Sequence, residues 1–222
     1  MSLKKPKHSE TCVYCGSSAG TSDYVPPRSF FPKPRPSNLI TVPCCRRCNQ
    51  RKEKDEEFFL ATFMFSDAAQ TKVGQELWVE KMNRLYFRGR GVGSAIRKRM
   101  RPLNLVTPSG LYAGKSIGVE IDYDRLDSVV KNVVRGLYYE EFGEAIASSA
   151  EVECNWLNSH SLFQTTLPHV KDLRFGKIWP GVFEYRGDRV PEQPSSSIWV
   201  MRFFEHAIYW AITGEQENAA ND

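Results

Sequence analysis

Five of the six cysteines in this 222-residue chain stand within its first 48 residues. Four of them form two Cys-x-x-Cys pairs, Cys12 with Cys15 and Cys45 with Cys48. Each pair presents two thiolates from one tight turn, and two pairs complete the tetrahedron of soft ligands that Zn²⁺ prefers. We therefore expect one structural zinc ion on these four residues. Cys44 could replace Cys45 as a ligand, although the Cys-x-x-Cys spacing favours Cys45.

The segment from residue 12 to about residue 55 is rich in proline and arginine and has little apolar periodicity. Such a segment cannot bury a sizeable core of its own, so the metal is expected to supply most of its folding free energy. Its prolines favour short extended pieces over a long helix. A helix is expected to begin near Cys48 and to run into the apolar stretch 58–65.

Three short motifs lie between and after the cysteine pairs, in the order Asp23-Tyr24-Val25-Pro26-Pro27, Asn38-Leu39-Ile40 and Cys48-Asn49-Gln50-Arg51-Lys52. With the cysteine pairs, they make roughly residues 12–60 resemble the HNH endonuclease family. That family has a ββα-metal fold flanked by zinc knuckles, an Asp-His-x-x-Pro strand, a central Asn and a terminal His or Asn at the start of the helix. The resemblance implies a metal-dependent enzyme that hydrolyses phosphodiester bonds, with DNA preferred over RNA as the substrate.

The resemblance also implies roles for single residues. Asp23 and Asn49 would be the protein ligands of a catalytic Mg²⁺ or Mn²⁺ ion, which suits their hard oxygen donors. The metal would stabilise the charge that builds on the scissile phosphate. Asn38 would hold the loop between the two strands. Each match has a plain structural alternative, because Asp23 could start a turn, Asn38 could cap a turn and Asn49 could cap the helix.

Tyr24 departs from the family pattern, in which the general base is a histidine directly after the aspartate. A phenol with a pKa of about 10 is ionised in only about one molecule in a thousand at pH 7. Tyr24 could still act as the base or as a nucleophile. The alternative is a catalytically impaired zinc module that binds nucleic acid or another protein.

The charge of the chain is uneven. Residues 1–55 carry eleven Lys and Arg against four Asp and Glu, whereas residues 56–222 carry nineteen against twenty-two. A basic front end indicates a phosphate-rich partner, here double-stranded DNA. The expected nucleic-acid contacts are Arg46, Arg47, Arg51 and Lys52. A second basic cluster, 84–101, is interpreted as a solvated helix face with a linker, and the alternative is a second DNA contact.

The whole chain is predicted to be an α+β protein, in which a small zinc-stapled module precedes a mixed domain of unassigned function. The predicted parts are a basic arm (1–11), the HNH-like module (12–65), the mixed domain (66–213) and a polar tail (214–222). Within the mixed domain, helices are expected at 75–87 and 124–139, and strands at 117–121, 179–185, 198–204 and 207–212. The last two strands are expected to form a hairpin.

The sequence has no apolar run of membrane-spanning length and no apolar segment behind its basic N-terminus. We therefore expect a cytoplasmic protein without a membrane partner. Nothing in the sequence indicates the oligomeric state.

Overall fold

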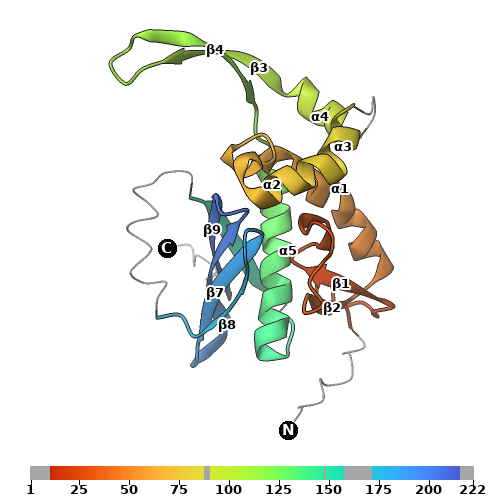
Figure 1. Ribbon diagram of the computed structural model, residues 1–222. Coiled ribbons are helices and arrows are strands. Elements are labelled where there is room, and N and C mark those ends of the chain that lie inside the picture. The colour runs from red at the N-terminus through yellow and green to blue at the C-terminus, as the bar shows by residue number, and fades with distance from the viewer. Residues whose placement is uncertain (1–10, 88–90, 148, 158–171, 216–222) are drawn as a thin grey trace.

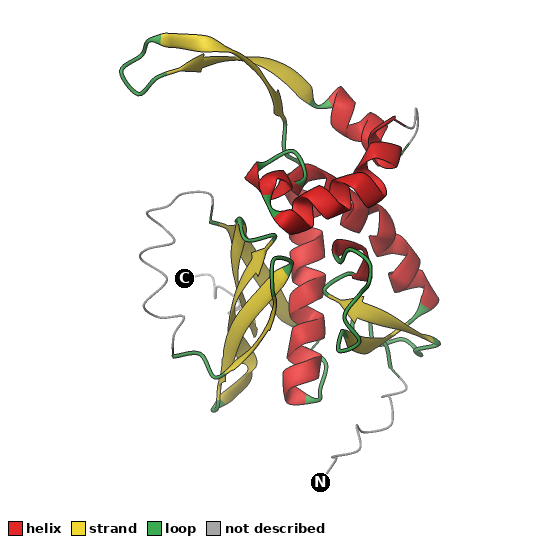
Figure 2. Cartoon of the chain, viewed as in Figure 1, coloured by secondary structure: helices red, strands yellow, loops and turns green. Residues whose placement is uncertain are grey.

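The computed structural model describes residues 11–87, 91–147, 149–157 and 172–215. They form an α+β protein with three antiparallel sheets (Figures 1 and 2). The helices are α1 (Arg46–Phe63), α2 (Lys72–Leu77), α3 (Asn83–Phe87), α4 (Val92–Lys98) and α5 (Tyr123–Phe142), with short helical turns at η1 (Arg28–Phe30), η2 (Asp67–Gln70) and η3 (Trp78–Met82). The strands are β1 (Thr21–Val25), β2 (Ile40–Cys44), β3 (Met100–Val106), β4 (Tyr112–Val119), β5 (Ala150–Trp156), β6 (Phe175–Trp179), β7 (Phe183–Val190), β8 (Gln193–Phe203) and β9 (Ala207–Glu215).

Helix α5 is the centre of the molecule. In Figure 1 it runs between the sheet β5-β9-β8-β7-β6 on one side and the β1–β2 hairpin with α1 on the other. Its buried apolar side chains recur at spacings of three and four residues, so both neighbours can cover the helix. At Gly136 the helix comes so close to β1 that an added Cβ would lie 2.3 Å from a methyl of Val25. A glycine is therefore required for this approach.

The N-terminal segment shares a core with the C-terminal sheet. Phe30 is fully buried, stacks on Phe59 of α1 with ring centroids 5.2 Å apart and meets the edge of Phe203 of β8. Val25, Phe31, Ile40 and Val42 join the same buried cluster. The expectation that residues 12–55 lack core packing is therefore wrong. The segment contributes few apolar residues, but α1, α5 and β8 cover them. The predicted domain boundary at residue 65 therefore falls within a continuous core.

Most predicted elements of the second half are present. The helix expected at 124–139 is α5, and the one at 75–87 is the continuous α2–η3–α3 stretch. The hairpin expected near Glu205 is β8–β9, turned by Phe204 and Glu205 at positive φ. The single strand expected at 179–185 is wrong, because a turn at 180–182 separates β6 from β7.

Other predictions concern the ends of the chain and the second basic cluster. The polar tail was expected from residue 214, but β9 continues to Glu215; residues 1–10 and 216–222 lie outside the described residues. The cluster 84–101 contributes to α3 and α4, with 88–90 outside the described residues. Of the helices formed by the described residues, none has the length and hydropathy that spanning a membrane requires.

Candidate metal centre

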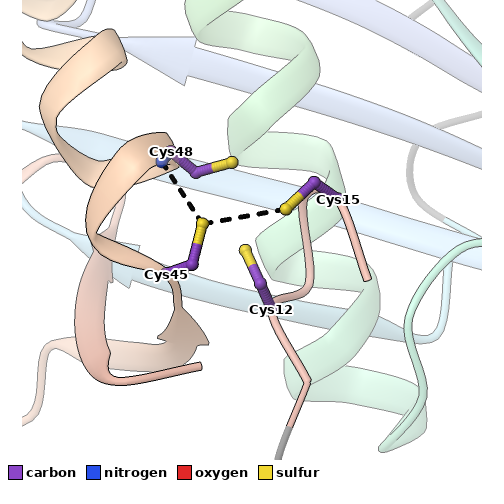
Figure 3. A group of neighbouring side chains, drawn as sticks. All are labelled: Cys12, Cys15, Cys45 and Cys48. Atoms are coloured by element: carbon purple, nitrogen blue, oxygen red, sulfur yellow. Dashed lines mark hydrogen bonds between the residues drawn. The ribbon is translucent and has the colours of Figure 1, made fainter. Parts of the chain in front are cut away.

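The two cysteine pairs flank the open end of the β1–β2 hairpin, one before β1 and one after β2. The four sulfur atoms of Cys12, Cys15, Cys45 and Cys48 lie within 4.8 Å of one another (Figure 3). The Cys15 and Cys45 Sγ atoms are 3.7 Å apart, and ligands at about 2.3 Å in a tetrahedron around zinc are separated by about 3.8 Å. The spacing and the soft donors fit a structural Zn²⁺ ion, and a complete four-thiolate set leaves no position for a substrate.

Local backbone geometry explains how the pairs are placed. Gly16 adopts φ +71° just after the first pair, and its N–H donates to the Cys12 carbonyl, which closes the turn. The second pair begins α1, where Cys45 is the N-cap and its Sγ accepts a hydrogen bond from the Cys48 N–H at 3.4 Å. The hairpin register, with Thr21 opposite Cys44, then brings the two turns side by side.

Cys44 lies outside this cluster. It is fully buried in β2, and its Sγ donates to the Cys45 carbonyl at 3.2 Å. Burial raises the pKa of the Cys44 thiol to about 12, which keeps it protonated at neutral pH. The choice of Cys45 over Cys44 as a member of the metal-binding set is therefore confirmed.

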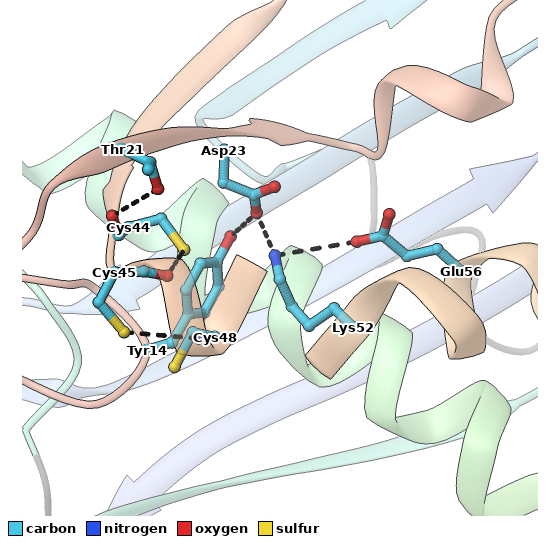
Figure 4. A network of polar contacts seen from close by, with 8 residues as sticks. All are labelled: Tyr14, Thr21, Asp23, Cys44, Cys45, Cys48, Lys52 and Glu56. Carbon is cyan, nitrogen blue, oxygen red and sulfur yellow. Dashed lines mark hydrogen bonds and ion pairs between the residues drawn. The ribbon is translucent and has the colours of Figure 1, made fainter. Parts of the chain in front are cut away.

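Next to the cysteines, Asp23 is held inside the protein by two donors (Figure 4). Its Oδ2 accepts a hydrogen bond of 2.5 Å from the Tyr14 hydroxyl and forms an ion pair with Lys52. The Lys52 and Asp23 side chains are only 6% and 9% exposed. Lys52 Nζ also lies 3.8 Å from a carboxylate oxygen of Glu56. In Figure 4 the other Asp23 oxygen points away from both donors.

A cavity of about 410 Å³ opens beside this network. Its wall brings together three of the residues singled out from the sequence, namely Asp23 and Tyr24 from β1 and Asn49 from the first turn of α1. The other lining residues are Arg28, Ser29, Gln50, Glu53, Glu56 and Glu57. The Arg28 guanidinium lies 5.3 Å from the centre of the Tyr24 ring. Arg28 is the one cationic side chain among these lining residues, and none of them is a histidine.

Asn38 lies apart from this cavity. It is exposed in the loop between β1 and β2, and its Oδ1 accepts a hydrogen bond of 3.3 Å from Trp179 Nε1 of β6. Its side chain therefore fastens that loop to the C-terminal sheet, a structural role.

The basic surface at the start of α1 is smaller than the sequence indicated. Arg46, Arg47 and Arg51 are exposed, but Lys52 is buried in its ion pair. The assignment of Lys52 to the nucleic-acid contacts is therefore wrong. Cys48, Lys52 and Glu56 are spaced four residues apart, so their side chains lie on one face of α1. This face points into the protein because Cys48 belongs to the four-cysteine cluster. That spacing was a signal in the sequence for Lys52, whereas no signal identified Tyr14.

Glu56 is the most perturbed carboxylate of the cavity wall. Burial raises its pKa to about 7, and the nearby Lys52 charge offsets only part of the effect. Because the folded state then holds a proton that the unfolded chain loses near pH 4.3, stability should fall as the pH rises from about 4.5 to 7. The difference in the free energy of unfolding amounts to at most about 4 kcal/mol.

We expect Glu56→Gln to remove this fall, because the amide keeps the shape of the side chain without a charge. Urea unfolding between pH 5.5 and 8.5 should show the variant gaining stability over the parent as the pH rises. Glu53→Gln, a change at an exposed position of the same helix, is the matched control. Parallel curves for the parent and Glu56→Gln would contradict the assignment.

No protein-family model, curated protein or solved structure matches this chain. The resemblance to the HNH family therefore depends on the residues themselves and on their positions in the structure.

Proposed function

We propose that this protein is an HNH-type, metal-dependent endonuclease that hydrolyses phosphodiester bonds in DNA. One observation carries the proposal: Asp23, Tyr24 and Asn49, which the family resemblance joins in one site, line one cavity beside the four-cysteine cluster. Strand β1 carries Asp23 and Tyr24, α1 carries Asn49, and β1, β2 and α1 follow one another in the order of a ββα-metal module.

The donor atoms fit a hard divalent cation. Asp23 would offer the oxygen that Tyr14 and Lys52 leave unused, and Asn49 would offer its amide oxygen. Few protein ligands, all of them oxygen, suit Mg²⁺ or Mn²⁺. When bound, the cation would supply charge stabilisation for the phosphate under attack. Tyr14 and Lys52 hold the aspartate in a fixed orientation from behind, as the supporting residues of metal sites do.

The remaining residues divide the other tasks. Arg28, the cation of the cavity wall, would bind a phosphate oxygen of the substrate. The Tyr24 hydroxyl would take the place of the family's histidine and accept the proton of the attacking water once ionised. Arg46, Arg47 and Arg51 would bind the flanking DNA backbone, and this contact is expected to weaken as salt rises.

A plasmid-nicking assay with Mg²⁺ or Mn²⁺ tests the proposal. We expect the parent protein to nick DNA and Asn49→Ala to lose at least about a hundredfold in rate, because one of two metal ligands is gone. Gln50→Ala, a neighbour on the same cavity wall, is the control and should retain activity. If the Tyr24 phenol is the base, the single variant Tyr24→Phe should also lose nicking activity, as Asn49→Ala does. Parent activity in the Asn49→Ala protein would refute the site.

A second candidate function is a zinc module that binds nucleic acid without cleaving it. The observation that favours it is the Asp23–Lys52 ion pair, because an ammonium group already neutralises the proposed metal ligand. In that case DNA should bind to the parent protein while neither Mg²⁺ nor Mn²⁺ produces nicking. Nicking that requires Asn49 would exclude this candidate.

A further inference from the structure

Strands β3 and β4 form an arm, Met100–Val119, that projects away from the rest of the molecule (Figure 1). A cavity of about 370 Å³ lies where the base of this arm meets the end of α1. Its wall is built by the end of α1, by α3, by the base of the arm and by the end of β5. The cavity shares no lining residue with the one beside β1, so it is a separate candidate site.

Two pairs of aromatic rings stand in the wall of this second cavity. The rings of Phe63 and Trp156 meet edge to face, with centroids 5.3 Å apart. Those of Phe65 and Tyr86 lie 5.5 Å apart. Trp156 also stacks on the buried ring of Tyr209 at 6.3 Å. Such ring pairs hold one another in place, so the wall is formed before any ligand enters.

The size and charge of the cavity limit the kind of ligand. None of the described residues that line it is charged, whereas Asp23, Arg28 and three glutamates line the cavity beside β1. A charged ligand would lose its hydration here without gaining a partner. An apolar cavity of about 150 Å³ accepts benzene, and this one is more than twice as large. The lining therefore favours a neutral, flat molecule of two fused rings.

Two hydroxyl groups of the lining residues lack a good partner. Thr62, in the last turn of α1, is 7% exposed, and its Oγ1 is buried without a hydrogen bond to any described residue. A helical threonine commonly donates to the carbonyl four residues earlier, and an unpaired buried hydroxyl costs free energy. Among the described residues, the Tyr86 hydroxyl donates only to the Met100 sulfur, a weak acceptor 3.8 Å away. A ligand oxygen could pair with either hydroxyl.

We propose that this cavity binds a neutral, planar small molecule of two fused rings that carries one hydroxyl or carbonyl oxygen. The rings pack against the aromatic wall, and the oxygen bonds to the Thr62 hydroxyl, so apolar contact supplies affinity and a single polar group fixes the orientation. Met100 and Val119 place the base of the arm in contact with the ligand. Binding at this site does not depend on the proposed nuclease activity.

2-Naphthol is the probe for this site, because it is neutral at pH 7 and has two fused rings and one hydroxyl. Calorimetric titration of the full-length protein should show one site per chain. 2-Naphthoate has the same rings with a carboxylate, and it should bind at least about tenfold more weakly because the cavity offers no cation. Equal affinity for the two compounds would overturn the proposal, as would no binding of 2-naphthol up to its solubility limit.

Two variants place the binding in the cavity. Val119→Trp fills the space at the base of the arm and should weaken 2-naphthol binding at least about tenfold. Val106→Trp, a change at a position of the same arm that is 63% exposed and outside the cavity, is the matched control and should retain the parent affinity.

Thr62→Val protects the test against a misfolded Val119→Trp protein. It keeps the shape of the side chain and removes only the hydroxyl, so it should weaken binding about fivefold. The same change should raise the thermal stability of the ligand-free protein, because the hydroxyl that it removes is buried and unpaired there. Parent affinity in either variant would overturn the proposal. A crystal structure in which a side chain of this chain fills the cavity would overturn it too.

Discussion

Cys45→Ser and Cys48→Ser are expected to lose the bound zinc and the fold of the N-terminal segment together. Structural zinc contributes about 10–16 kcal/mol in small zinc-stapled peptides, more than the total stability of most domains. Here the sulfurs join the turn before β1 to the first turn of α1, so loss of the metal frees both strands at the open end of the hairpin. The effect should extend into the common core, because Phe30 and Phe31 depend on the loop of that hairpin.

Cys44→Ser provides a stringent control for this prediction. It changes a fully buried cysteine directly beside a ligand, yet its sulfur is not in the cluster. Elemental analysis should find one equivalent of zinc in the parent and in Cys44→Ser, and far less in Cys45→Ser. Cys154→Ser, in β5, should also keep its zinc. Equal zinc loss in Cys44→Ser and Cys45→Ser would contradict the assignment of the ligands.

The second large effect is expected from the buried ion pair. Lys52→Met leaves the Asp23 carboxylate buried without its cation, and removing one partner of such a pair destabilises a protein by about 3–5 kcal/mol. Asp23→Asn leaves Lys52 with only the more distant Glu56 and should cost a similar amount. The double variant should be much less destabilised than the sum of the two, because neither charge is then left alone.

Chemical denaturation of the two single variants and the double variant measures this coupling. Glu120→Gln is the reference variant. Both side chains of its ion pair with Arg101 are more than half exposed, so the pair should contribute at most about 1 kcal/mol to the free energy of unfolding. Additive effects of Lys52→Met and Asp23→Asn would show that the two side chains do not interact in solution. The zinc content of each variant separates this effect from loss of the metal.

The four-cysteine cluster could be predicted from the sequence because the information is local. Each Cys-x-x-Cys pair fixes the positions of two thiolates through its own turn. The rest of the N-terminal segment offers few other side chains that could bind zinc. Helix α5 was predictable for a similar reason, since its apolar residues repeat with the period of a helix that is covered on two sides.

Features that depend on distant parts of the chain were not predictable. The four-residue spacing of Cys48, Lys52 and Glu56 indicates that Lys52 shares their helix face, but only the packing of α1 against β1 shows that it is buried beside Asp23. Phe30 and Phe31 are too few to form a core within their own segment, and their partners lie on α1 and on the C-terminal sheet. Of the β3–β4 arm, only the end of β4 was predicted, as a strand at 117–121, because the other apolar side chains of the arm are exposed, against the usual rule for strands.

The proposed catalytic function depends on a second metal ion in the cavity beside β1. A crystal of the parent protein soaked in Mn²⁺ tests this most directly, because anomalous scattering identifies each metal by its absorption edge. The account predicts a zinc peak among the four cysteine sulfurs and a manganese peak between the Asp23 carboxylate and the Asn49 side chain. A fully occupied zinc site with no manganese in the cavity would contradict it.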